Sequence, residues 1–440
     1  MMEESQMYKK LLVIAAVDVI AGNVDLLSEI LLRLPTKSLI RFSIVCKLWC
    51  SIITGMQFRL SHCRSLAFSN AISPSGIYFY NCLTYQKIIS LPLADNATSL
   101  PPLPLLDQFI NSSIGGDTVT EFKVTQSCNG LLMCIFTAST TRITIKKGIV
   151  YNPANGECCL LPTYKKCDQF VYYNLISDPS EPPYYKVLCV TRMGYGYSDI
   201  DVSVYVPKSY SWRSCCHFSA PRMAFDSGVF WNGAIYWISK YSSFYFDVKS
   251  EKVAEISMPP RPQGGFTQKI RYFGEWGGHL HLIQVQSRYA KKFNVLELDK
   301  DTWKWSVKYH VHLAQLISTF PEMVQQTSYG IQYAFSILSV IRGEKEEDSV
   351  LLLTIPGKVV AYNLVLKTAK VVRELPGEVV DTVFFNQVCA YQYTESLVPV
   401  SEWTVGPEKS SYQQLSKTSE FLLEKGDLLG TSSEYFFKDA

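Results

Sequence analysis

The sequence predicts an α+β chain in which a small three-helix module at the N-terminus precedes an all-β domain. A β-propeller is the favoured architecture for that domain, and a β-sandwich is the alternative. Apolar residues recur at helical spacing between residues 24 and 54, whereas strand-like alternating runs recur from residue 65 onward. Aromatic residues make up 13% of the chain, with 27 Tyr, which favours strands for its greater part.

Composition describes a folded chain with room for more than one domain. Hydrophobic residues make up 47% and charged residues 18% of the 440 residues, which excludes a disordered chain. The net charge is +3 without a dense Lys/Arg patch, so no nucleic-acid partner is expected. No apolar stretch approaches a membrane span, so no membrane association is expected either.

The 13 cysteines lack the spacing of a zinc site or of a disulfide framework. Free thiols in a reducing compartment fit this pattern. We therefore expect an intracellular protein, in the nucleus or the cytoplasm.

The first helix is expected near residues 24–34, after an N-terminal extension of residues 1–22. Its apolar face is formed by Leu26, Leu27, Ile30, Leu31 and Leu34. Asn23 or Asp25 can cap it. Pro35 ends it at Leu34, because proline disfavours helical backbone at the preceding residue.

Two further helices complete a helical domain over residues 23–62. Thr36 can cap the second helix, and Gly55 can stop the third. The apolar residues of these two helices are Leu39, Ile40, Phe42, Val45, Leu48, Trp49, Ile52 and Ile53. Such a small unit is marginal alone, so we expect it to pack on a partner or on the next domain.

The run from Asp25 to Phe42, continued by Val45–Trp49, resembles an F-box. The resemblance depends on R-L-P, K-S-L-x-R-F and V-C-K-x-W in this order. It implies binding to the Skp-type adaptor of a cullin–RING ubiquitin ligase through an apolar helix face. The residues implied for the adaptor surface or its packing are Leu26, Ile30, Leu31, Leu34, Pro35, Ser38, Leu39, Val45, Cys46 and Trp49.

This module departs from the usual F-box at its start. F-boxes usually open with Leu-Pro three residues before the Asp, and Gly22 and Asn23 hold those places here. A stand-alone binding module without ligase coupling therefore stays open as an alternative.

Residues 65–405 carry six copies of one strand pattern. In each copy a strand that usually ends in an aromatic triplet is followed by a turn and a more polar strand. The copies begin with Ile77–Asn81, Ile149–Pro153, Val202–Val206, Phe244–Asp247, Val295–Asp299 and Val360–Asn363. Asn129-Gly130, Asn232-Gly233 and Gly277-Gly278 precede three of them as tight turns that allow positive φ. The spacing predicts propeller blades, with a short helix from Leu313 to Gln326.

This region also resembles the F-box-associated domain of plant F-box proteins. The residues that carry the resemblance are Ser127–Leu132, Tyr151–Glu157, Val229–Trp237 and Ala390–Val398. It implies a domain that recruits a protein target, and the residues that bind the target are unknown. Residues 406–440 are expected to form a polar tail.

No pattern in the sequence predicts catalysis. His279-His281 and His310-His312 could each share a strand face, but no third metal ligand lies nearby in sequence, so we expect no metal and no cofactor. A phosphate loop, a nucleophile elbow and a clustered acid pair are all missing. The chain is interpreted as the substrate-recognition subunit of an SCF-type ligase and not as an enzyme, with a carbohydrate-active propeller enzyme as a further alternative.

Overall fold

The computed structural model describes most of the chain between residues 23 and 400. The described ranges are 23–68, 74–81, 88–93, 99–101, 103, 118–139, 144–164, 171–178, 184–193, 198–221, 223–239, 242–259, 269–285, 290–328, 330–375 and 388–400. The predicted N-terminal extension (1–22) and polar tail (406–440) lie outside them.

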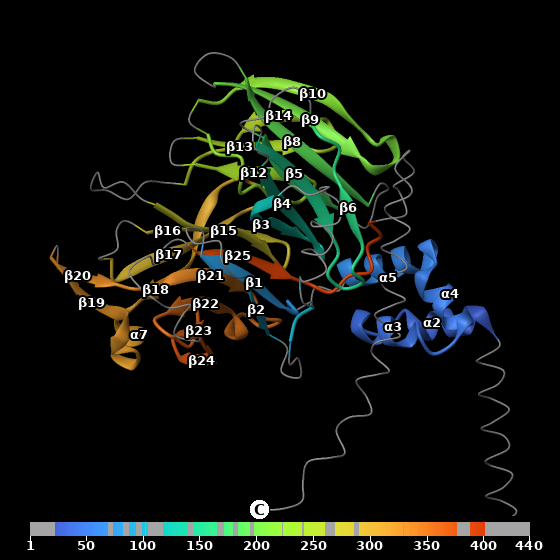
Figure 1. The fold of residues 1–440 in the computed structure, drawn as a ribbon. Coiled ribbons are helices and arrows are strands. Elements are labelled where there is room, and N and C mark those ends of the chain that lie inside the picture. The colour runs from blue at the N-terminus through green and yellow to red at the C-terminus, as the bar shows by residue number, and fades with distance from the viewer. Residues whose placement is uncertain are drawn as a thin grey trace, which may run out of the picture.

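Four helices form the N-terminal module, which lies beside the propeller (Figure 1). They are α2 (Val24–Leu31), α3 (Thr36–Phe42), α4 (Lys47–Thr54) and α5 (Met56–Phe68). The sequence predicted three. It missed α5 because the buried face of α5 includes Arg59 and His62, whose polar character hides the helical apolar period. α5 also runs through residues 63 and 64, between the two ranges predicted for the domains.

The helix ends differ from the prediction in two places. Asn23 caps α2 as predicted, because its Oδ1 atom accepts the N–H groups of Asp25 and Leu26 at 3.1 Å each. α2 stops at Leu31 and not at Leu34, because the following residues form tighter i to i−3 turns. The prediction that Thr36 caps α3 was also wrong.

Thr36 is the first helical residue of α3, after Pro35, and its hydroxyl donates instead to the Glu395 carbonyl at 3.3 Å. Gly55 follows the last residue of α4, as predicted.

The β-region is a six-bladed propeller, which confirms the favoured architecture over the sandwich. Blade 1 contains β1 (Gly76–Asn81), β2 (Ile89–Pro92) and β25 (Val388–Tyr393). Blade 2 contains β3 (Thr118–Cys128), β4 (Leu131–Ser139), β5 (Thr144–Tyr151) and β6 (Cys158–Leu160). Blade 3 contains β7 (Val171–Ser177), β8 (Tyr185–Met193), β9 (Asp199–Val206) and β10 (Ser211–Ser219).

The other three blades repeat this order. Blade 4 contains β11 (Val229–Trp231), β12 (Ala234–Ile238), β13 (Ser243–Asp247) and β14 (Lys252–Glu255). Blade 5 contains β15 (Lys269–Trp276), β16 (His279–Val285), β17 (Lys292–Leu298) and β18 (Trp305–His312). Blade 6 contains β21 (Ser336–Ile341), β22 (Val350–Ile355), β23 (Lys358–Asn363) and β24 (Ala369–Glu374). Each predicted repeat forms the two outer strands of one blade.

The propeller closes by pairing the two ends of the β-region. β25 pairs antiparallel with β1, from Gly76 opposite Tyr393 to Asn81 opposite Val388. The innermost strands β25, β3, β7, β11, β15 and β21 each contact their two neighbours, so they form a complete ring. Closure of this kind leaves only short, protected sheet edges.

Tight turns join the first and second strands of three blades. Asn129 and Gly130 have φ values of 46° and 84°, and Gly277 and Gly278 have values of 59° and 78°. Positive φ at both central residues is typical of the hairpin turns that match strand twist. The predicted Asn-Gly and Gly-Gly turns are confirmed.

Between blades 5 and 6 lies α7 (Ala314–Thr319), within the predicted helical stretch, followed by a 3₁₀ turn at Pro321–Met323. The two-stranded ribbon of β19 (Val324–Thr327) and β20 (Gly330–Tyr333) comes next. Short 3₁₀ turns also occur at Pro207–Ser209 and Glu346–Asp348. Within the residues that the structure describes, no helix is both long and apolar enough to cross a membrane.

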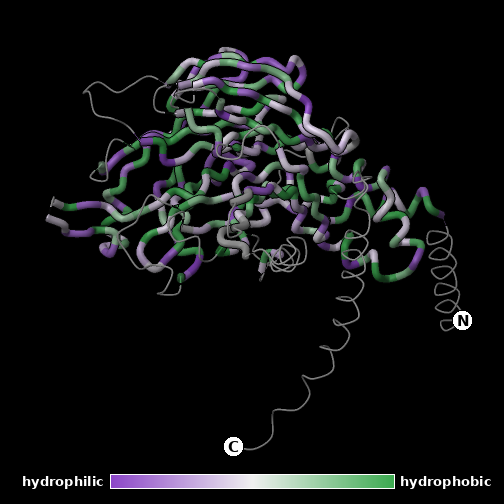
Figure 2. Tube along the Cα trace, turned by 45° about the horizontal axis from the view of Figure 1, so that its top comes forward, coloured by the Kyte–Doolittle hydropathy of each residue, from purple (hydrophilic) through white to green (hydrophobic). Residues whose placement is uncertain are grey.

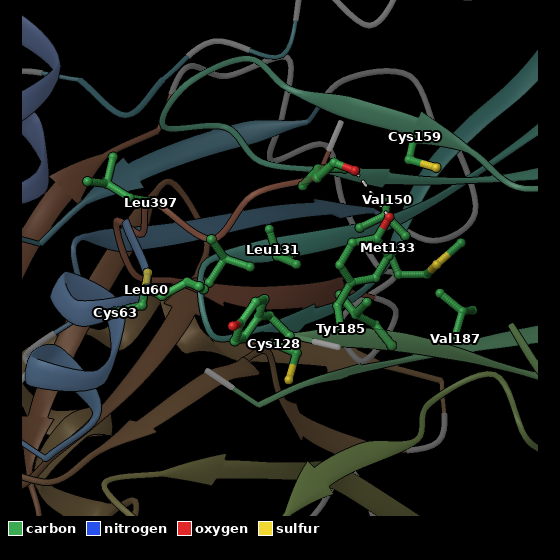
Figure 3. Packing of buried hydrophobic residues seen from close by; sticks show 14 of the residues in the cluster. Leu60, Cys63, Cys128, Leu131, Met133, Val150, Cys159, Tyr185, Val187 and Leu397 are labelled. Atoms are coloured by element: carbon green, nitrogen blue, oxygen red, sulfur yellow. Dashed lines mark hydrogen bonds between the residues drawn. The ribbon is translucent and has the colours of Figure 1, made fainter. Parts of the chain in front are cut away.

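One hydrophobic core joins the helical module to blades 2 and 3. Leu31 and Leu39 of the helices, Met133 of β4 and Tyr185 of β8 belong to the same buried cluster. Figure 3 shows Leu60 and Cys63 of α5 with Leu131 and Leu397 in this cluster. Figure 2 shows hydrophobic stretches of chain in the helical module as well as in the blades. The module packs on the next domain, as expected for so small a unit.

Ten of the described cysteines are free thiols, and most of them are buried. Cys389 on β25 is disulfide-bonded. The expectation of free thiols was therefore wrong at this position.

Candidate functional site

The helical module presents two groups of exposed apolar side chains. Leu26 and Ile30 on α2 are 46% and 47% exposed, and Val45 before α4 is 60% exposed. α2 and α4 contact each other, so the two groups lie on neighbouring elements. The full set of exposed apolar side chains on the module is Val24, Leu26, Ile30, Ile44, Val45 and Leu48. We call this set the apolar surface.

The apolar surface is unusual for this molecule. Thirteen large apolar side chains are exposed in the described part of the chain, and six of them lie between Val24 and Leu48. Exposed apolar residues scattered one by one need no explanation, but their concentration on one small module marks an interaction surface.

The ten residues predicted for the adaptor surface or its packing separate into two groups. Leu31 and Leu39 are buried, and Leu34 and Trp49 are half-buried and pack against the same core. Ser38 is also half-buried. Those that face outward are Leu26, Ile30, Pro35, Val45 and Cys46.

Two details hold the half-buried members in place. The Trp49 ring packs edge-on against Phe42, with ring centroids 5.3 Å apart. The Leu34 carbonyl accepts a hydrogen bond from His62 Nε2 at 2.9 Å. Sequence reasoning did not assign Val24, Ile44 or Leu48 to this surface. For Leu48 its helical spacing with Ile52 pointed to the core, and only tertiary packing shows that it faces outward.

The propeller has a cavity of about 830 Å³ in its central channel. Residues of the inner strands β3, β11, β15, β21 and β25 line it, together with the tight turns at Gly130, Gly233 and Gly278. Cys63 and Leu66 of α5 complete one wall. Cavities of this size with mixed polar walls can hold a peptide side chain or a small ligand.

A half-buried carboxylate is one of the charged groups in the channel wall. Glu275 on β15 lines the cavity, and one of its oxygens accepts the Gly278 N–H at 2.8 Å. Burial raises the pKa of Glu275 above its usual value. Burial raises the pKa of Cys128 on β3, which lines the same cavity, and the charge of Glu275 adds to this effect.

A second polar group ties blades 1, 5 and 6 together at the channel wall. The Gln392 amide donates to the Tyr272 hydroxyl at 3.1 Å and to the Ser339 hydroxyl. Burial raises the pKa of Tyr272 to about 12, so this phenol stays protonated at neutral pH.

The structure brings Glu297 to the predicted histidine pair His279 and His281. The carboxylate lies 3.0 Å from His279 Nδ1 and 3.4 Å from His281 Nε2, and Arg342 Nη1 lies 3.3 Å away. Although burial opposes it, hydrogen bonding to the two imidazoles holds the pKa of Glu297 well below its usual range. Burial lowers the pKa of His281. Among the described side chains, no group of three or more His, Cys, Asp and Glu residues could hold a metal ion.

Two family descriptions match this chain. Residues 23–61 match the F-box domain, and residues 88–348 match the F-box associated beta propeller domain. The chain belongs to the F-box-associated β-propeller family. The F-box match covers the helices that carry the apolar surface, and the propeller match covers most of the propeller that encloses the cavity.

Plant F-box proteins are similar to this chain. It is 29% identical over 409 residues to the F-box protein At5g07610 of Arabidopsis thaliana, covering 87% of this chain and 93% of that protein. It is 28% identical over 251 residues to the F-box/kelch-repeat protein At3g17530 of Arabidopsis thaliana, covering 53% of this chain and 60% of that protein. A solved nidogen/laminin complex aligns with a TM-score of 0.36 at 11% identity, over 73% of this chain and 99% of that one.

Proposed function

We propose that this F-box propeller protein is the substrate-recognition subunit of an SCF-type cullin–RING ubiquitin ligase. The F-box binds a Skp-type adaptor, and the propeller recruits a protein target. The ligase then acts by holding the target beside the ubiquitin-charged enzyme, so this chain supplies position and not chemistry. An intracellular location, in the nucleus or the cytoplasm, is part of the proposal.

The apolar surface is the observation that carries this proposal. The isolated chain exposes six large apolar side chains on two contacting helical segments. Covering them with a partner removes apolar surface from water and lowers the free energy of the complex. Helix faces of this kind bind in apolar grooves. The match of residues 23–61 to the F-box domain supports a Skp-type adaptor as the partner.

The cavity supports the second half of the proposal. Its walls combine turn backbone with Glu275, Trp231 and Gln392, so it offers both apolar contact and fixed polar groups. Binding residues concentrate on the loops of a rigid scaffold, and the channel mouth of a propeller is such a place.

Co-purification with a Skp-type adaptor tests the proposal. Ile30→Asp places a charge at a position that is 47% exposed, and Val307→Asp does the same on β18 at 45% exposure. We expect the intact chain and the Val307→Asp control to bind, and Ile30→Asp to weaken binding by about thirtyfold or more, as an interface hot spot does. Both positions are exposed, so neither substitution should disturb the core.

Two outcomes would overturn this reading. Equal binding by Ile30→Asp and Val307→Asp would show that the apolar surface is not the adaptor contact. If the intact chain fails to bind while an F-box that opens with Leu-Pro does bind, the ligase coupling is wrong. The chain would then be a stand-alone binding module.

A further inference from the structure

The segment that follows the closing strand β25 runs between the F-box and the propeller. We call residues 394–400 the strap. Leu397, Val398 and Val400 are at most 3% exposed and belong to the core that the F-box shares with blades 2 and 3. In Figure 1 the chain passes from β25 toward α5 and β6.

Blade 2 and blade 3 hold the strap from the propeller side. The Asn152 amide donates to the carbonyls of Ser396 at 3.0 Å and Val398 at 2.9 Å. The Tyr185 hydroxyl donates to the Val400 carbonyl at 3.3 Å. Gly130 leaves the strap its space, because a Cβ atom at Gly130 would lie 2.3 Å from Ser396 Cβ.

The F-box holds the strap from the other side. Arg59 Nε of α5 donates to the Leu397 carbonyl at 2.8 Å. At the start of α3, the Lys37 N–H donates to the Glu395 carboxylate at 3.1 Å, next to the Thr36 contact with the Glu395 carbonyl. The strap is thus hydrogen-bonded on both sides along its length.

One ion pair joins all three parts directly. Both terminal nitrogens of Arg59 donate to Glu157 on blade 2 at 2.8 Å, while the Val400 N–H donates to the same carboxylate at 2.9 Å. The side chains of Arg59 and Glu157 are only 5% and 22% exposed. Separating such a pair leaves a charge buried without its partner, which is strongly unfavourable.

We propose that the strap locks the F-box onto the propeller in one orientation, with Arg59 and Glu157 as its positioning residues. Gly130, Asn152, Glu157 and residues 394–398 of the strap lie in three of the segments that carry the resemblance to the F-box-associated domain. Those segments therefore build an internal docking site for the F-box.

The lock has a consequence that rests on the proposed function. It fixes the direction from the adaptor surface to the channel, and it completes the cavity wall, because Cys63, Glu395 and Ser396 line that cavity. A ligase built on this chain would present a bound target to the ubiquitin-charged enzyme at one fixed angle, and so modify a narrow set of lysines.

The direct test measures the distribution of distances between the two domains in the whole chain. Azido amino acids are introduced at the exposed positions Ser51 on α4 and Lys249 on blade 4, and spin labels are attached to them. This avoids labelling the cysteines. Arg59→Met removes the guanidinium while keeping most of the stem, and Glu157→Gln keeps the shape of the acceptor.

The chain also offers a matched control pair. Arg213 on β10 and Glu251 beside β14 form the same two-pronged pair, but the Arg213 side chain is 59% exposed. Arg213→Met therefore breaks an equivalent contact away from the junction. Surface pairs contribute little, so this variant should behave like the intact chain.

We expect one narrow distance distribution for the intact chain and for Arg213→Met. Arg59→Met and Glu157→Gln should broaden it, and should speed amide exchange in α2–α5 by about tenfold or more while the blades stay protected. An unchanged distribution in a folded Arg59→Met or Glu157→Gln chain overturns the lock. A second result would also overturn the lock: fast amide exchange in α2–α5 of the intact chain together with slow exchange in the strap. This measurement needs no variant.

A ligase readout separates positioning from folding. The chain is assembled with Skp-type adaptor, cullin and RING subunits, and its own modified lysines are mapped by mass spectrometry. We expect a restricted set for the intact chain and Arg213→Met, and a wider set for Glu157→Gln at equal adaptor affinity. An identical set for all three would refute the positioning role. Failure of adaptor binding would refute the proposed function and leave the distance measurement to decide on the lock.

Discussion

Asn152 and Asn363 occupy the same local turn structure, but we expect their side chains to contribute very differently to the free energy of unfolding. Both follow a tyrosine at the end of a third blade strand, and both open the same turn. In each turn the Asn N–H donates to the carbonyl five residues later, at 2.8 Å for both. We predict that replacing the two asparagines will have unequal effects, because only Asn152 faces the strap.

The magnitude follows from the partners that each amide loses. Asn152 is fully buried, and Asn152→Ala leaves two strap carbonyls and the Ala154 N–H without a partner. Each buried unpaired group costs about 1–3 kcal/mol, so a loss of at least about 3 kcal/mol is expected. Asn363 donates to the Glu347 carbonyl and accepts the N–H groups of Val365 and Leu366, but all three bonds are at exposed sites where water can replace them, so Asn363→Ala should cost about 1 kcal/mol.

Asn152→Asp sharpens the comparison, because it keeps the shape of the side chain. It replaces the amide donor with an oxygen that faces the carbonyls of Ser396 and Val398, so we expect a loss of stability at least as large as for alanine. Asn363→Asp, at the exposed turn, should be close to neutral.

Urea unfolding followed by the fluorescence of the 8 tryptophans measures all four variants. Amide exchange in α2–α5 and the strap then locates the loss. The reasoning is refuted if Asn152→Ala costs no more than Asn363→Ala, or if Asn152→Asp is as stable as the intact chain.

Two further predictions concern backbone space and pH. Gly130→Ala and Gly233→Ala both place a Cβ atom at positive φ, which costs about 1–2 kcal/mol; only Gly130 also meets the strap at Ser396, so its unfolding midpoint should fall clearly further. An equal fall for both would contradict this. Burial lowers the pKa of His62 and His281. Near pH 6.5 these imidazoles are therefore protonated in the unfolded chain but remain neutral in the folded chain. The free energy of unfolding should accordingly be highest above that pH and decrease as the pH falls below it. Urea midpoints at pH 7.5 and 5.5 should show this fall, and His281→Gln should reduce it; an equal fall in that variant would speak against His281 as a source.

The sequence determined the features that depend on neighbours along the chain. Helical periodicity located α2 to α4, and Asn23 and Gly55 marked two of their ends because capping and chain reversal are local effects. Six repeats of a strand, turn and strand predicted propeller blades, since each repeat must bury the same apolar face against the next one, but they left the number of blades open. The structure has six.

Tertiary structure decided what depends on contacts between distant segments. Leu26 and Leu31 lie five residues apart in one helix and were both assigned to its apolar face. Leu26 is nevertheless 46% exposed and Leu31 is 1% exposed, because only the propeller core and the strap define the inner side. α5 escaped prediction because Arg59 and His62 are buried by partners 338 and 28 residues away in sequence. Asn152 and Asn363 differ in burial for the same reason. Periodicity and turn type depend on residues that are close in sequence, whereas burial depends on which distant segment packs against the turn in the closed ring.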